Sequence, residues 1–292
     1  MTIAIVIKVE DGVVLAADSA STLVATGAQG DERVLNVYNN AEKVFNLCEG
    51  LPVGGLAWGA GSIGRASIST LAKDLRKRLT GWDKDRADWA LDPNSYSLEA
   101  LAARTRQFLY EEKYRLEYED PYQHQYEDLP SKPSLGLIVA GYSAGDDLAE
   151  AWQIEIIGGE CSEPTRLSSR EDVSLTWRGQ PEAITRLIMG HGTGLATVLS
   201  ELGVPDDQLG PAMERIRRSL QAPLLEAPMP VQDAIDLAEF LAHTTIMFSR
   251  FSPGAATVGG PIQIAAITKH EGFKWIRRIR YYDPALNPGI GD

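Results

Sequence analysis

The chain is poor in cysteine and has fewer positive than negative charges. Among its 292 residues only Cys48 and Cys161 are cysteines, too few and too far apart for a disulfide framework or a zinc site. Its 28 Lys and Arg residues stand against 40 Asp and Glu residues, which gives a net charge of −12. Because a phosphate-binding surface needs clustered cations, nucleic acids and anionic membranes are poor candidates for partners.

Long hydrophobic runs and a basic leader are also lacking. The longest apolar runs, such as residues 135–140, are too short to span a bilayer. The first residues, MTIAIVIKVEDG, carry no positive charge before their apolar stretch, which argues against a signal peptide. The four histidines have no ligand spacing, so we expect neither a metal nor another cofactor. The sequence predicts a cytoplasmic globular protein with one domain, residues 1–292.

The hydrophobic pattern predicts β-hairpins followed by helices. Residues 2–9 and 13–17 are short β-branched runs, and Asp11-Gly12 between them suits the positive φ angles of a tight turn. The polar residues 19–33 predict a loop. Further predicted strands cover residues 34–38, 43–47, 53–58, 135–141, 150–157, 174–177, 262–268 and 275–281, and predicted helices cover residues 63–79, 97–109, 181–190, 205–219 and 231–251. This order fits an α+β fold in which two antiparallel sheets are stacked between helix layers.

Thr2 can carry nucleophilic chemistry once the initiator methionine is removed. Removal of Met1 is normal before a small second residue, and it would leave a hydroxyl and a free α-amine on one residue. An α-amine has a reference pKa of about 7.7–8.0, so it can activate the hydroxyl of its own residue near neutral pH. Thr2 is therefore a candidate nucleophile.

Asp18 and Lys43 are candidates to support that nucleophile. In a hairpin that turns at Asp11-Gly12, the end of the second strand lies beside the start of the first, which brings Asp18 close to Thr2. A lysine at the same place would lower the pKa of the Thr2 hydroxyl, and a carboxylate would hold that lysine. Lys43 stands at the edge of an apolar run and could fill this role. The alternative is an ordinary solvated ion pair.

A glycine-rich turn, GAGSIGRA over residues 59–66, lies between a predicted strand and a predicted helix. Free backbone N–H groups at such a helix start, those of Gly59 and Gly61 among them, can bind a developing oxyanion. The spacing of Gly59, Gly61 and Gly64 also matches a dinucleotide-binding fingerprint. That motif needs a parallel strand soon after one helix, whereas here two helical segments precede the next strand.

These residues, in this order, resemble the proteasome β-subunit family and its bacterial ring-forming homologues. Thr2 matches the family's N-terminal threonine, and Asp18 matches the aspartate that ends its second strand. Lys43 matches the lysine of the family's K-[IV]-F segment. Its A-G-S-x-G segment matches residues 60–64. Three later segments are similar to the family's AGY strand, the start of its last long helix and the Gly-Gly turn before its last hairpin: residues 137–142, 229–238 and 259–262.

The resemblance implies a threonine-type endopeptidase with the four-layer αββα sandwich of N-terminal nucleophile hydrolases. Thr2 would attack a peptide carbonyl, Lys43 and Asp18 would support it, and the Gly61 N–H would bind the oxyanion. The resemblance also implies a homo-oligomeric ring around a proteolytic chamber. Peptides or unfolded proteins would be its substrates, and an ATP-dependent unfoldase would be its partner.

The chain departs from the family in several places. It has insertions near residues 19–33, 117–133 and 205–228. The family serine that contacts the catalytic amine is missing from the corresponding stretch, WRGQ over residues 177–180, and the late Asp-x-x-Ser-Gly-Gly pattern is replaced by FSPGAATVGG over residues 251–260. Thr257 and Ser252 are candidates to substitute. Two other functions therefore stay open, a catalytically silent ring subunit of the same fold and an amidase for small molecules.

Overall fold

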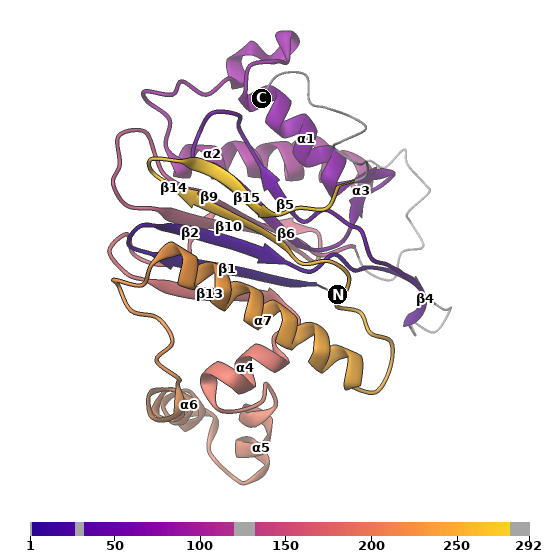
Figure 1. Ribbon diagram of the computed structural model, residues 1–292. Coiled ribbons are helices and arrows are strands. Elements are labelled where there is room, and N and C mark those ends of the chain that lie inside the picture. The colour runs from indigo at the N-terminus through magenta and orange to yellow at the C-terminus, as the bar shows by residue number, and fades with distance from the viewer. Residues whose placement is uncertain (1, 27–31, 120–131, 281–292) are drawn as a thin grey trace.

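The structure, a computed structural model, describes residues 2–26, 32–119 and 132–280. The chain has a mixed α+β fold built on two antiparallel sheets, and helices cover the outer face of each sheet (Figure 1). This arrangement confirms the predicted α+β class.

The first sheet has five strands in the order β13-β1-β2-β14-β15. Their bounds are β1 Ile3–Val9, β2 Gly12–Ala17, β13 Ser174–Gly179, β14 Gln263–Thr268 and β15 Gly272–Arg277. Every neighbouring pair is antiparallel, and Ala4 pairs with Ala17, so the end of β2 lies beside the start of β1 as predicted. Helices α4, Glu182–Met189, and α7, Val231–Phe251, pack on this sheet.

The second sheet has six strands, of which five follow the order β11-β10-β9-β6-β5, and β12 pairs with β10. Their bounds are β5 Val44–Asn46, β6 Val53–Gly59, β9 Leu135–Gly141, β10 Glu150–Ile157, β11 Glu160–Cys161 and β12 Thr165–Arg166. The helical elements against it are α1 Ile68–Leu79, α2 Leu98–Arg106, the π-helical η2 Gln107–Tyr114 and α3 Arg115–Tyr118.

The core lies in three places because each sheet is covered on both faces. In β1, Ile3, Ile5 and Ile7 belong to the cluster beneath α4 and α7. Ala4 and Val6 of the same strand belong to the cluster between the two sheets. This alternation follows from the period of two in a strand, and it explains why all of β1 is buried.

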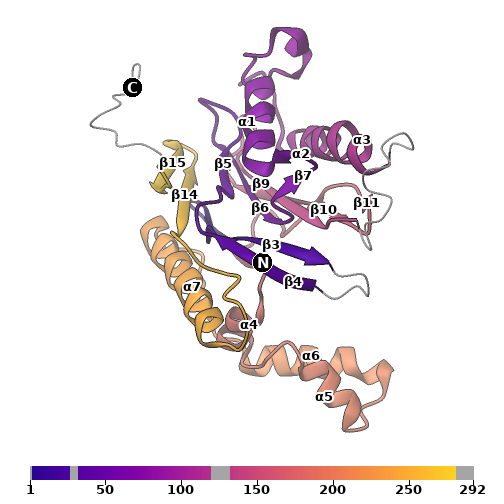
Figure 2. The same cartoon turned by 90° about the vertical axis from the view of Figure 1, so that its right-hand side faces the viewer.

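Two segments near the N-terminus differ from the sequence prediction. Residues 19–33 do not form a simple loop, because β3, Ser21–Thr26, pairs with β4, Glu32–Tyr38, in a hairpin that projects from the two sheets (Figure 2). The first helix begins at Ile68 and not at Ile63. Gly64 has a φ of +54°, which an α-helix does not use, so Ser62–Ile63 and Ala66–Ser67 instead form the short strands β7 and β8.

Smaller differences concern the connections and the C-terminal half. The segment between α1 and α2 contains the 3₁₀ helix η1, Lys84–Trp89. The helix α5, Leu195–Glu201, precedes α6, Asp206–Leu220. The last strand begins three residues earlier than predicted, and Tyr281 lies outside the described residues, as does most of the insertion near 117–133. Within the described ranges, no helix has the length and apolar character needed to cross a membrane.

Candidate active site

The structure gathers the four predicted site residues at one end of the two sheets. A cavity of about 120 Å³ there is lined by Thr2, Lys43 and Gly61, together with Gly59 and Trp58. Asp18 follows the end of β2 and forms an ion pair with Lys43. Residues far apart in the sequence therefore face one small space, because β1, the end of β2, the start of β5 and the end of β6 meet there.

Asp18 is the centre of the hydrogen-bond network at this end. Its Oδ1 atom accepts hydrogen bonds from Lys43 Nζ at 2.7 Å and from the Ile3 N–H at 3.1 Å. Its Oδ2 atom accepts from the Ala20 N–H at 3.1 Å and the Gly259 N–H at 3.0 Å. The carboxylate is completely buried, and four donors satisfy it, as a buried charge requires.

Lys43 is buried beside this carboxylate. Its side chain is only 9% exposed, and Asp18 provides the compensating negative charge. The pKa of Lys43 lies below its ordinary value of 10.5 because burial disfavours the cation, and the nearby Asp18 carboxylate opposes that effect. The ammonium group therefore has one fixed position next to the cavity that Thr2 lines.

A buried glutamine, which the sequence analysis missed, fixes the backbone that carries Lys43. Gln263 of β14 accepts a hydrogen bond from the Lys43 N–H at 3.2 Å, and its Nε2 donates to the Ala41 carbonyl at 2.9 Å and to Ser19 Oγ at 3.0 Å. The Ser19 hydroxyl donates in turn to the Pro261 carbonyl. A polar residue inside the apolar run IQIAAIT was the available signal, because buried amides need partners.

The two stretches that depart from the family pattern reach the site through their backbones. The Gln180 N–H donates to the Thr2 carbonyl at 2.7 Å. Gly179 has a φ of +89°, and a Cβ there would overlap the Thr2 carbonyl oxygen, so this close approach requires glycine. In the later stretch the Gly259 N–H binds Asp18, whereas the exposed Ser252 hydroxyl donates to the Phe248 carbonyl at the end of α7.

The glycine turn closes the other side of the cavity. The Gly61 carbonyl accepts from the Ile68 N–H at 3.0 Å, and the Ala60 N–H donates to the Ser134 carbonyl at 2.8 Å. Within the described part of the chain, the Gly61 N–H makes no hydrogen bond, which leaves it available to an acceptor in the cavity. The dinucleotide interpretation is excluded by topology, because β6 before the turn pairs antiparallel with β9, the next long strand.

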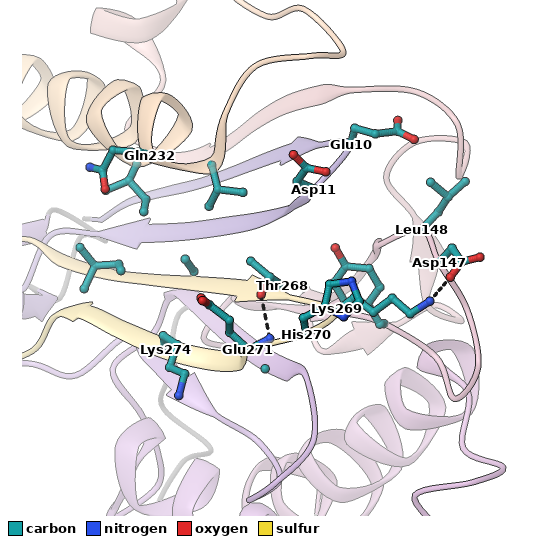
Figure 3. Close-up of a pocket in the computed structure, with 16 residues that line it drawn as sticks. Glu10, Asp11, Asp147, Leu148, Gln232, Thr268, Lys269, His270, Glu271 and Lys274 are labelled. Carbon is teal, nitrogen blue, oxygen red and sulfur yellow. Dashed lines mark hydrogen bonds and ion pairs between the residues drawn. The ribbon is translucent and has the colours of Figure 1, made fainter.

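A larger cavity lies at the opposite end of the sheets. It measures about 700 Å³ and is lined by the β1–β2 turn, the β14–β15 turn and the start of α7 (Figure 3). Lys269 and Asp147 form an ion pair at its edge. None of the predicted site residues lines it. In the described ranges, no group of His, Cys, Asp or Glu side chains is arranged to hold a metal ion.

Comparison with known proteins adds no further evidence. No family model matches the chain, and no curated protein matches its sequence. Any assignment of function therefore rests on the residues and geometry of this chain.

Proposed function

We propose that this chain is an N-terminal-threonine peptidase of the proteasome-like type. The observation that carries the proposal is the buried Lys43–Asp18 pair, which adjoins the cavity lined by Thr2 and Gly61. Burying two charges costs free energy unless they are closely paired and hydrogen-bonded, and this pair meets that condition. A cation held at a fixed position beside a hydroxyl and an α-amine has a direct chemical use, because it stabilises the alkoxide form of the nucleophile.

We also propose that the fold is the four-layer αββα sandwich of N-terminal nucleophile hydrolases. Three separate hydrophobic clusters support this assignment, one between the sheets and one beneath each group of helices. The position of Thr2 at the first residue before β1 supports it as well, since that fold presents its nucleophile at the start of the first strand.

The proposed reaction begins after Met1 has been removed. The Thr2 hydroxyl attacks the peptide carbonyl, and the Thr2 amine takes the hydroxyl proton, directly or through a water molecule. Lys43 lowers the pKa of the hydroxyl, Asp18 holds Lys43, and the Gly61 N–H binds the oxyanion. The departing amine receives the proton, and water then hydrolyses the acyl-enzyme ester and frees Thr2. This scheme uses no cofactor.

For this activity we propose a homo-oligomeric ring in the cytoplasm. An ATP-dependent unfoldase would supply the ring with unfolded protein. The second candidate is a catalytically silent ring subunit. The missing family serine favours that candidate, because the corresponding stretch, WRGQ over residues 177–180, contains no serine.

Hydrolysis of a panel of fluorogenic peptides tests the proposal. We expect turnover by the wild-type protein and none by the Thr2→Ala variant, with unchanged thermal unfolding. Thr197→Ala, on the exposed surface of α5, is the matched control and keeps wild-type rates. Full activity of Thr2→Ala would rule out the mechanism, and an inactive wild-type protein that still assembles into a ring would favour the silent subunit.

A further inference from the structure

The glycine turn has a second anchor at its tip, away from the cavity. Between β7 and β8, the Gly64 N–H donates a hydrogen bond to the Tyr118 hydroxyl oxygen at 2.9 Å. The Glu117 side chain lies against Gly64, so closely that a Cβ at this glycine would overlap it. The end of α3, more than fifty residues later in the chain, thus holds the tip of the turn that carries Gly61.

Two ordered residues connect the tip of the turn to Gly61. Ser62 pairs with Ser67 and Ile63 pairs with Ala66 in the short β7–β8 ladder, and the Ile63 side chain is buried in the core. Only Ser62 and Ile63 separate Gly61 from Gly64. This short ladder therefore joins the tip of the turn to Gly61 through two ordered residues.

Tyr118 is itself in contact with a second tyrosine ring on the same helical segment. Its ring lies 4.8 Å from the ring of Tyr114, and the buried Tyr114 donates its hydroxyl proton to the Pro133 carbonyl at 2.7 Å. The next residue, Ser134, accepts the hydrogen bond from the Ala60 N–H. The start of the turn, at Ala60, and its tip, at Gly64, are therefore both attached to structure that the Tyr114–Tyr118 pair contacts. The π-helix η2, which carries Tyr114, is a type of irregularity often found near functional sites.

We propose that Tyr118 is a positioning residue that aims the Gly61 N–H at the developing oxyanion. This inference rests on the proposed function, since it assigns Tyr118 a part in the same reaction. An oxyanion donor acts only when it points to where charge develops in the transition state, and small displacements are costly in rate. Loss of the Tyr118 hydroxyl should therefore slow the chemical step and leave ground-state binding of the peptide nearly unchanged.

Tyr118→Phe is the test, with Tyr110→Phe as the matched control. Tyr110 lies in η2, and its hydroxyl donates to the Gly159 carbonyl at 3.0 Å, so its change removes one tyrosine hydrogen bond away from the turn. For Tyr118→Phe we expect kcat to fall about tenfold and KM to stay within about twofold, because a lost hydrogen bond and a displaced donor act mainly on the transition state. Tyr110→Phe should keep the wild-type kcat.

A pair of inhibitors separates positioning from a merely structural role. A peptide aldehyde forms a hemiacetal with Thr2 and needs the oxyanion donor, whereas the peptide amide of the same sequence does not. Tyr118→Phe should bind the aldehyde about tenfold more weakly, in proportion to its loss of kcat, and bind the amide as the wild type does. Equal losses for both inhibitors, equal losses in both variants, or an unchanged kcat in Tyr118→Phe would overturn the inference.

The same experiment distinguishes failure of the inference from failure of the proposed function. If the wild-type protein and Tyr110→Phe turn over peptides and Thr2→Ala does not, the proposed function stands, whatever Tyr118→Phe does. If the wild-type protein neither cleaves peptides nor binds the aldehyde more tightly than the amide, the proposed function fails, and the role of Tyr118 fails with it.

Discussion

The two ends of the sheets each hold a Lys–Asp ion pair, but in opposite surroundings. At the Thr2 end the side chains of Lys43 and Asp18 are 9% and 0% exposed, beside a cavity of about 120 Å³. At the other end those of Lys269 and Asp147 are 41% and 81% exposed, beside a cavity of about 700 Å³. Exposed pairs contribute only about 0–1 kcal/mol. The smaller cavity thus adjoins the buried ion pair, whereas the larger cavity adjoins an exposed one.

Replacing each of the two lysines by methionine should have very different effects on peptide hydrolysis. Lys43→Met keeps much of the apolar stem but removes the positive charge that the proposed mechanism places beside the Thr2 hydroxyl. We expect kcat/KM for peptide hydrolysis to fall by about 10²–10⁴-fold, the range for loss of a group that assists proton transfer. Steady-state kinetics measure the effect at a temperature where circular dichroism shows the variant folded.

Lys269→Met, beside the larger cavity, is the control. The kcat/KM of this variant should stay within about twofold of the wild-type value, because surface substitutions usually have small effects. If Lys43→Met and Lys269→Met have equal rates, the assignment of Lys43 is wrong and its burial is only structural.

Replacing each of the two aspartates should affect the pH dependence of kcat/KM differently. The pKa of Lys43 is lowered by burial, and Asp18 raises it, so Asp18→Asn should lower it further. Activity that needs the cation is lost as Lys43 deprotonates, and we expect the alkaline fall of kcat/KM to move to lower pH in Asp18→Asn. In Asp147→Asn, at the exposed pair, the profile should not move. An unmoved alkaline fall in both variants would show that Lys43 does not titrate in the reaction.

The same shift has a consequence for stability. Between the lowered pKa of Lys43 and its ordinary value of 10.5, the unfolded chain binds more protons at this group than the native chain. The contribution of Lys43 to the free energy of unfolding therefore rises with pH in that window. Asp18→Asn extends the window to lower pH, which denaturant unfolding measured at several pH values would reveal.

The smallest expected effect concerns two glutamines. Gln263→Leu leaves the Lys43 N–H and the Ala41 carbonyl without the partner that Gln263 provides, and it removes one of the two hydrogen bonds of the Ser19 hydroxyl. We expect it to lower the free energy of unfolding by about 2 kcal/mol or more. Gln232→Leu, at the exposed start of α7, should stay within about 0.5 kcal/mol of the wild type. Urea denaturation compares them, and similar values would mean that Gln263 does not organise the site.

Local signals explain what the sequence could predict. Asp11-Gly12 between two β-branched runs predicts the β1–β2 hairpin, and that hairpin alone implies that Asp18 lies near Thr2. The apolar face of residues 231–251 predicts α7 with the bounds that the structure has. In each case the spacing of a few residues contains the physical cause.

Tertiary contacts explain what the sequence could not predict. Ile63 has the right spacing for α1, but the left-handed backbone at Gly64 stops a helix there, and Gly64 takes that conformation where it meets Glu117 and Tyr118. Gln263 and Ser19 form a hydrogen bond although more than two hundred residues separate them in the sequence. The periodicity of a strand or helix predicts no contact at such a separation. The β3 strand was missed because the polar residues around it resemble a loop.

The intact mass of the protein, before and after treatment with a peptide epoxyketone, shows whether Thr2 is a free N-terminal nucleophile. This electrophile needs both the hydroxyl and the free amine of an N-terminal threonine. The account predicts a chain without Met1 that gains one adduct, mapped to Thr2 by peptide sequencing. A chain that retains Met1 and gains no adduct would contradict it and would leave Asp18 and Lys43 with a structural role.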